Sequence, residues 1–333
     1  MEKLNVAYFV NDAREKLEGR GANRMAAIHT GVIVAVGLVL TVVQMMLSES
    51  MGKATGLSGL GTVSLLQTAQ TVLQWANTLL VPFWNLGFLY VALQWARSSG
   101  AADRDLLTGF QRIGPCIGLL LNRFLICFGV MFLTVNICST AYMATPAGTQ
   151  LMEMITAAGG DMNAIYEMSE AQMTELMASM TPMLIIWGIL CILLLVPILY
   201  RFRLAEYAIL DYPGIRALPA MILSAGLLRR RCWQLFKLDL RFWWYYGLKL
   251  LCMLVCYADV LLSAAGVILP VEADVIFIVT YIAYLALLFG VEACFRPRVE
   301  TAYACAYDAL KEMGPALRKT ASATPRNLPR DTE

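Results

Sequence analysis

The sequence has little charge and a single histidine. Charged residues make up 15% of its 333 positions, and apolar residues make up 59%. Soluble domains carry more charge than this, so the composition argues against a soluble globular protein and favours a membrane protein. Because His29 is the single histidine, the sequence argues against a catalytic Ser–His pair and against a metal site with several histidine ligands. We expect His29, at the start of the first apolar run, to be interfacial and solvated.

Motifs for metal, disulfide and nucleotide sites are also missing. The nine cysteines form no C-x-x-C pair, and most lie in apolar runs or on the predicted cytoplasmic side, where thiols stay reduced. The glycines at 56, 59 and 61 follow no strand and precede no Gly-Lys-Ser/Thr, so they are not a phosphate-binding loop. We therefore expect no cofactor, no metal, no nucleic-acid partner and no enzymatic activity.

What the sequence does contain is long apolar runs. A membrane-crossing helix needs about 20 such residues, and several runs are longer. The fold class predicted is all-α: a polytopic bundle of six transmembrane helices, with cytoplasmic amphipathic helices between spans four and five. The six spans lie near Ala26–Leu47, Val72–Ala96, Ile117–Met143, Met183–Tyr200, Phe242–Leu269 and Val275–Phe295.

The basic residues set the orientation of these spans. Of the 26 lysines and arginines, 23 fall on one side of the predicted spans, and only Lys53 lies in a loop on the other side. Basic residues mark cytoplasmic segments. We therefore predict a multi-pass protein of the cell membrane with both termini in the cytoplasm.

The remaining segments complete the predicted organisation. Residues 1–25 form an amphipathic helix anchored to anionic lipid, and residues 26–310 form the membrane domain. Within that domain we expect an outer-loop helix at about 163–181 and a cytoplasmic amphipathic stretch at about 201–241. Residues 311–333 lack apolar periodicity, which predicts disorder.

The stretch at 201–241 is the most unusual part of the chain, because it is apolar in its middle and strongly basic. Pro213 and Gly214 predict that a helix stops near Tyr212, and a second helix resumes from Ile215 to Leu228. Basic and aromatic side chains that follow are typical of contact with anionic lipid headgroups. The predicted contacts are Arg229, Arg230, Arg231, Trp233 and Lys237.

A pattern of residues extends from this stretch to the last span. It consists of Pro197, Tyr207, Asp211 with Pro213, Ser224, Leu227-Leu228-Arg229, Trp233-x-Leu235-Phe236-x-Leu238-Asp239-Leu240-x-Phe242, Pro297, Thr301, Ala304, Tyr307 and Leu310. This pattern resembles the bacterial integral-membrane family called domain of unknown function 975. The sequence departs from that family at Ile198, Arg230, Arg241 and Arg298. The resemblance implies a membrane bundle and no particular activity.

Polar residues inside the spans supply a candidate intramembrane site. Asn77 and Asn85 lie on one helix face with Pro82 between them. They can lock the bundle through interhelical hydrogen bonds or line a polar seam. Asp259 interrupts the outer half of span five, and such a carboxylate is either functional or close enough to the outer surface to reach water. If it is functional, we expect it to lie near Asn77 or Asn85.

One further charged pair lies at the end of the last span. Glu292 precedes Arg296 by four residues, a spacing that places both side chains on one helix surface. We predict a structural ion pair at the inner membrane boundary.

Three classes of function remain. The first is a non-enzymatic bundle that docks lipid or a partner protein through its cytoplasmic amphipathic layer. The second is a transporter or permease component that moves a small solute through the polar seam. The third, an intramembrane enzyme acting on lipid, has the least support, because no nucleophile–base pair or paired carboxylates stand out.

Overall fold

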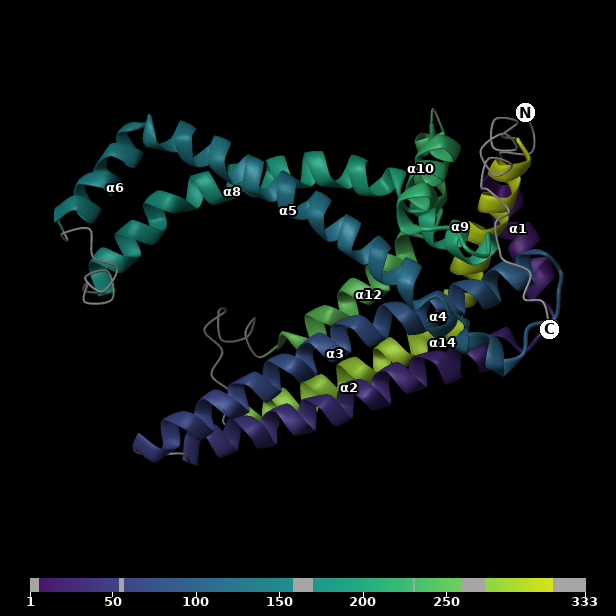
Figure 1. Cartoon of the computed structure of the whole chain (residues 1–333), viewed down its shortest axis with the longest axis horizontal. Helices are drawn as coiled ribbons and strands as arrows, with labels where there is room; N and C mark the ends of the chain where they lie inside the picture. Colours follow the sequence, from purple (N-terminus) through teal and green to yellow (C-terminus); the bar gives the residue numbers. More distant parts are fainter. Residues whose placement is uncertain (1–5, 54–56, 158–169, 230, 259–272, 314–333) are drawn as a thin grey trace, which may run out of the picture. The chain divides into compact units, whose positions relative to one another are not determined.

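The described part of the chain is built from helices (Figure 1). The computed structural model describes residues 6–53, 57–157, 170–229, 231–258 and 273–313, and within these ranges every regular element is helical. Five helical segments are long and apolar enough to cross a membrane: Ala22–Ser50, Ser64–Ala96, Ile113–Met143, Ala178–Asp211 and Ile278–Glu312. For the described residues, the prediction of an all-helical fold with several helices long and apolar enough to cross a membrane is confirmed.

The predicted fifth span is only partly described. Its beginning forms α12 (Trp243–Cys256), which has 14 residues and is shorter than the about 20 residues needed to cross a bilayer. Residues 259–269 of that span lie outside the described residues. The sixth crossing segment therefore stays a prediction.

The chain divides into two compact units, which are described separately. One unit contains Met1–Cys116 together with Leu204–Glu333, and the other contains Ile117–Arg203.

The smaller unit is a helical hairpin. Indole Nε1 of Trp187 donates a hydrogen bond of 3.1 Å to Oγ1 of Thr134, and this bond joins its two long helices. Its elements are most of α5 (Ile113–Met143), α6 (Pro146–Ala157) and α8 (Glu170–Arg201).

The predicted outer-loop helix is not a separate element. Residues 170–181 form the first turns of α8, which continues without a break to Arg201. Residues 163–169 lie outside the described residues.

The larger unit contains a bundle of long helices (Figure 1). In this bundle α14 packs on the other three helices, and α2 packs on α3. Large apolar side chains such as Val39, Met46 and Val72 are exposed on its outer surface, as expected of helices that face lipid. The bundle helices are α2 (Ala22–Lys53), α3 (Leu57–Ala96), α12 and α14 (Ala273–Glu312).

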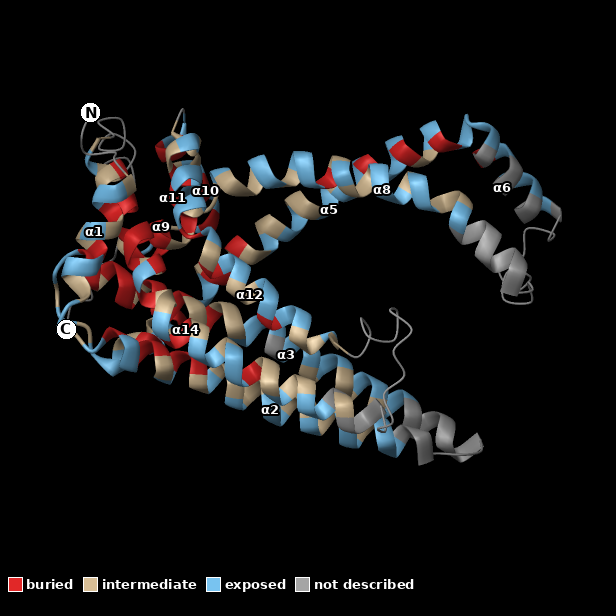
Figure 2. Cartoon of the chain, turned by 180° about the vertical axis from the view of Figure 1, so that it is seen from behind, coloured by how far each residue is buried: buried red, intermediate tan, exposed pale blue. Residues whose placement is uncertain are grey.

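Short helices surround one end of this bundle, and with the last part of α14 we call them the cap. The cap helices are α1 (Val6–Leu17), α9 (Ala205–Asp211), α10 (Ala217–Leu228) and α11 (Cys232–Arg241). Figure 2 shows that most of the buried residues lie here.

The helix α14 changes character along its length. Ile278, Val279 and Ile282 are 43–60% exposed, whereas no residue from Thr301 to Tyr307 exceeds 6%. A helix that is buried on every side for two turns lies inside a protein core. The last part of α14 is therefore the central helix of the cap.

The turn between α3 and α5 lies directly against α3. It contains η2 (Asp103–Leu107) and α4 (Thr108–Gln111). A Cβ atom on Gly87 of α3 would collide with the carbonyl oxygen of Leu106. Only glycine permits so close an approach of two backbones.

The predicted amphipathic stretch at 201–241 forms three helices, α9, α10 and α11. As predicted, a helix stops before Pro213: α9 ends at Asp211, and Gly214 adopts a φ of +87° in the turn. The hydroxyl of Ser224 in α10 accepts a hydrogen bond of 3.1 Å from the backbone N–H of Leu204. This bond satisfies a donor at the start of α9, which has no partner within its own helix.

The N-terminal helix is shorter than predicted and belongs to the cap. Instead of one helix over residues 1–25, α1 ends at Leu17 and a turn with Gly19 and Gly21 at positive φ leads into α2. Phe9 and Ala13 are buried, because α1 packs on α14. Residues 1–5 lie outside the described residues.

The predicted start of the disordered tail, at residue 311, is wrong, because the helix α14 extends past it. The helix α14 includes Lys311 and Glu312, because Lys311 forms an ion pair of 2.6 Å with Asp211. Residues 314–333 lie outside the described residues.

Candidate functional site

All four bundle helices contribute charged or polar side chains to one cluster, which we call the polar centre. Its members are His29 of α2, Asn85 of α3, Tyr245 and Lys249 of α12, and Glu292 and Arg296 of α14.

Glu292 is the anion of the polar centre. It is only 5% exposed. Its Oε1 atom lies 2.7 Å from Nζ of Lys249 and accepts a hydrogen bond of 3.0 Å from the Tyr245 hydroxyl. Its Oε2 atom lies 3.5 Å from a guanidinium nitrogen of Arg296 and has no hydrogen-bond partner. The carboxylate therefore depends on two cations to offset the cost of its burial.

Arg296 connects α14 to α2 and α3. One of its nitrogens donates a hydrogen bond of 2.9 Å to the side-chain oxygen of Asn85, and another lies 3.3 Å from Nδ1 of His29. The guanidinium also lies 4.8 Å from the centre of the Phe88 ring. Hydrogen bonds between helices stabilise membrane bundles, so Arg296 holds three helices together.

His29 is buried, so the prediction of a solvated residue is wrong. Its Nε2 atom lies 3.1 Å from the backbone carbonyl of Trp84, and the Trp84 indole donates a bond of 2.9 Å to the carbonyl of His29. A carbonyl only accepts, so Nε2 carries the proton and Nδ1 is left to accept from Arg296. The helix α2 begins seven residues earlier, at Ala22, and this places His29 within the contact between α2 and α3.

The predicted intramembrane site is therefore only partly described. Asn85 makes the interhelical hydrogen bond that one interpretation expected, and its partner is Arg296. Asn77 lies in α3, with its side chain outside the described residues, and Asp259 also lies outside them. The predicted proximity of Asp259 to the asparagines stays a prediction.

The predicted surface position of the pair Glu292 and Arg296 is wrong. Glu292 and Arg296 do pair at the predicted spacing, but Glu292 is buried and the side chain of Arg296 is only 11% exposed, so the pair lies between helices rather than on a helix surface. The role of Lys249 was missed, although a lone cation within an apolar run was a signal that it needed an anion.

A second charged cluster, the cap clamp, joins Arg97, which directly follows α3, to α9 and α14. Asp211 lies 2.8 Å from Arg97 and 2.6 Å from Lys311, and it accepts a hydrogen bond of 3.0 Å from Tyr307. Arg97 also forms two hydrogen bonds of 2.7 and 3.0 Å with Asp308. The bonds to Asp308 raise the pKa of Arg97 further above its already high value, so its charge is permanent.

The helix α11 exposes an apolar and basic surface, which we call the α11 outer face. Trp233, Phe236 and Leu240 are 64%, 44% and 59% exposed. They share this face, at helical spacing, with the exposed cations Lys237 and Arg241.

The opposite face of α11 holds the helix in the cap. Leu235 and Leu238 are buried there, and Asp239 accepts a hydrogen bond from the Tyr303 hydroxyl of α14. The α11 outer face is thus presented by a fixed helix.

The predicted headgroup contacts surround this face. Trp233 and Lys237 belong to it. Arg229 is exposed at the end of α10, and Arg231 is half-buried immediately before α11. Arg230 lies outside the described residues.

Comparisons with known proteins do not extend this description. No family model, curated protein or solved structure matches the chain. The resemblance to domain of unknown function 975 therefore stays a prediction. Across the ranges that the structure describes, no three His, Cys, Asp or Glu side chains are grouped so that they could hold a metal ion.

Proposed function

We propose that this chain is a non-enzymatic protein of the cell membrane whose cap docks on anionic lipid headgroups at the cytoplasmic surface. The observation that carries the proposal is the α11 outer face. A partner protein is the other occupant that the sequence allowed.

The composition of the α11 outer face supports lipid as the occupant. Three large apolar side chains on one short helix are unfavourable in water and favourable at a membrane interface. Lys237 and Arg241, on the same face, each add on the order of 1 kcal/mol near an anionic surface. Trp233 and Phe236 stack with ring centroids 5.2 Å apart, and aromatic rings favour the headgroup level.

The change from exposed to buried side chains along α14 supports a position of the cap just outside the hydrocarbon. Its large exposed apolar side chains extend to Phe289, and its fully buried part begins near Val299. This indicates that the hydrocarbon ends between these residues. Because 23 of the 26 lysines and arginines fall on the side of the cap and the two termini, we place all three in the cytoplasm.

The topology has a direct test. Reporter domains fused after Lys53 and after Glu153 are expected to report an extracytoplasmic location, because basic residues are scarce in both segments. Fusions at the two termini should report the cytoplasm. A cytoplasmic signal at Lys53 or Glu153 would overturn the orientation.

Removing the charge of the α11 outer face tests the docking. The double variant Lys237→Gln with Arg241→Gln is expected to bind phosphatidylglycerol about 30-fold more weakly, because two surface cations contribute about 2 kcal/mol. Native mass spectrometry of the full-length protein titrated with this lipid measures the change.

The matched control is Arg104→Gln with Arg112→Gln. It removes the same charge from the predicted cytoplasmic side but lies outside the α11 outer face. Unchanged phosphatidylglycerol binding in the α11 variant would count against lipid docking and would leave a partner protein as the occupant to test.

The polar centre favours a second candidate, a transporter or permease component. Buried charges inside a membrane bundle mark ion or solute pathways in many proteins. Here Glu292, Arg296 and Asn85 lie between helices, where such a pathway would run. The stability of Glu292 variants separates a pathway from a structural lock.

A further inference from the structure

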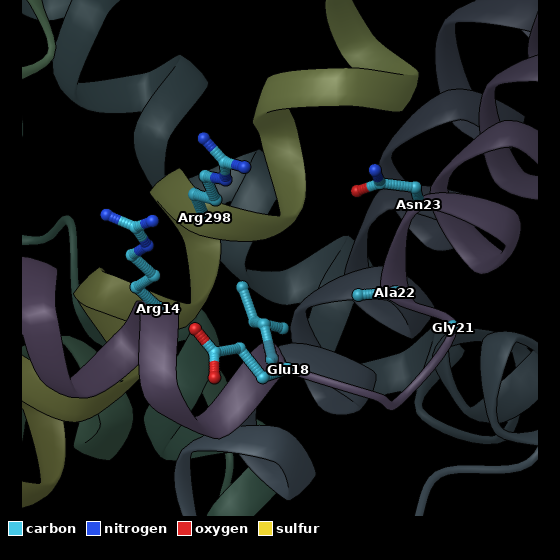
Figure 3. Close-up of a pocket in the computed structure, with 7 residues that line it drawn as sticks. Arg14, Glu18, Gly21, Ala22, Asn23 and Arg298 are labelled. Atoms are coloured by element: carbon cyan, nitrogen blue, oxygen red, sulfur yellow. The ribbon is translucent and has the colours of Figure 1, made fainter.

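A cavity separate from the polar centre and from the α11 outer face opens beside α1. Its volume is about 340 Å³. Three helices and one turn form its wall (Figure 3). The wall contains Arg14 and Leu17 of α1, Glu18 of the turn that follows, Ala22 and Asn23 at the start of α2, and Arg298 of α14.

The cavity is lined by two guanidinium groups that form no ion pair with a carboxylate of the described residues. Arg14, Glu18 and Arg298 all line this cavity, and Figure 3 shows the three side chains on the same side of it, with Asn23 on the other side. Both arginines are exposed, and within the described residues neither takes part in an ion pair or a hydrogen bond. Glu18 is four residues from Arg14 but does not pair with it. Two neighbouring cations repel each other, and a bound anion would relieve that repulsion.

The position of the cavity points to a lipid. Ala22, in its wall, is the first residue of a segment that can cross a membrane. Arg298 lies on α14 between the last exposed apolar residue, Phe289, and the buried part from Val299. The cavity therefore lies where the apolar surface ends, which is the level of phospholipid phosphates.

The carboxylate of Glu18 affects which lipid headgroup the cavity can bind. A carboxylate beside the two arginines disfavours a headgroup whose only charge is negative. It favours one that carries a phosphate and an ammonium group together. A primary ammonium donates up to three hydrogen bonds, and the Glu18 carboxylate and the Asn23 side-chain oxygen can accept them.

We propose that this cavity binds the headgroup of an amine-bearing phospholipid such as phosphatidylethanolamine. The phosphate binds Arg14 and Arg298, and the ammonium binds Glu18. The site goes beyond the proposed docking, since it lies on other elements and selects another headgroup.

Native mass spectrometry of the full-length protein in detergent tests the site. The probes are phosphatidylethanolamine, phosphatidylglycerol and inorganic phosphate. The double variant Arg14→Gln with Arg298→Gln is expected to weaken phosphatidylethanolamine binding by about tenfold or more, because it removes charge-assisted hydrogen bonds. Arg104→Gln with Arg112→Gln is the control of equal charge and should leave this binding unchanged.

The variant Glu18→Gln tests the selectivity. It should keep the phosphate contact and lose the preference for phosphatidylethanolamine over phosphatidylglycerol. Equal phosphatidylethanolamine binding by wild type and the double arginine variant would overturn the proposal. Competition by inorganic phosphate at the same concentration as the lipid would also overturn it, in favour of a site for free phosphate.

The two lipid proposals fail independently. Loss of phosphatidylglycerol binding in Lys237→Gln with Arg241→Gln leaves the cavity intact, and the cavity variants leave the α11 outer face intact. Thermal unfolding of each variant verifies that these exposed substitutions preserve the fold.

Discussion

Replacing Glu292 by glutamine is expected to lower the free energy of unfolding by about 3–5 kcal/mol, the cost of breaking a buried ion pair from one side. The variant leaves Arg296, whose side chain is 11% exposed, and Lys249 without their shared anion. Glutamine keeps the size of the side chain, so the effect measures charge and not packing. Thermal and denaturant unfolding in detergent measure the change.

A control and a rescue sharpen this prediction. Glu300→Gln removes a carboxylate that is more exposed and lies 4.0 Å from Arg296, and it should cost less than about 1 kcal/mol. Adding Lys249→Met to Glu292→Gln removes one of the two unbalanced cations and should restore part of the stability.

The outcome for Glu292→Gln also separates the two candidate functions. A large loss of stability identifies the polar centre as a lock between helices. If stability is unchanged, the lock is contradicted and a solute pathway becomes the better account of these buried charges.

The second large effect is expected at the cap clamp. Asp211→Asn should lower the free energy of unfolding by about 2–3 kcal/mol, because a buried carboxylate with charged partners loses its charge. Asp211 has a side chain only 6% exposed and binds Arg97 and Lys311. The same unfolding measurements apply.

Asp308→Asn is the matched comparison for the cap clamp. Asp308 shares Arg97 with Asp211, but its side chain is 25% exposed, and solvent weakens such a pair. Its loss should cost about 1 kcal/mol or less. Equal effects of the two substitutions would show that Asp211 is not the centre of the cluster.

Local signals in the sequence predicted much of the fold. Apolar runs identified the long helices, and Pro213 with Gly214 identified the end of α9. The end of α14 could not be found this way. The predicted span stops at Phe295, where charges begin, yet the helix continues to Glu312 because the cap buries its last turns. That burial depends on α1, α9 and α10, which come from distant parts of the chain.

The polar centre shows the same limit. Asn85 was identified as a candidate, because an amide in an apolar run needs a partner. Its partner could not be identified from spacing, since Arg296 is 211 positions away. His29 and Arg296 are separated by 267 positions, and only the packing of α2 on α14 brings them together.

The length of α14 has a mechanical consequence. A helix of 40 residues is about 60 Å long, roughly twice the hydrocarbon thickness of a bilayer. One continuous helix thus connects lipid-facing turns to the centre of the cap, and Figure 1 shows that this helix bends along its length. Pro297 lies inside it, and an internal proline kinks a helix. Helices adapt to bilayer thickness by tilting, and a tilt of about 5° over a lipid-facing part of about 30 Å moves the end of that part by about 2–3 Å. The α11 outer face is attached to the part of α14 that follows Pro297, through Asp239 and Tyr303. A thinner or thicker membrane would therefore shift the α11 outer face together with that part of the helix.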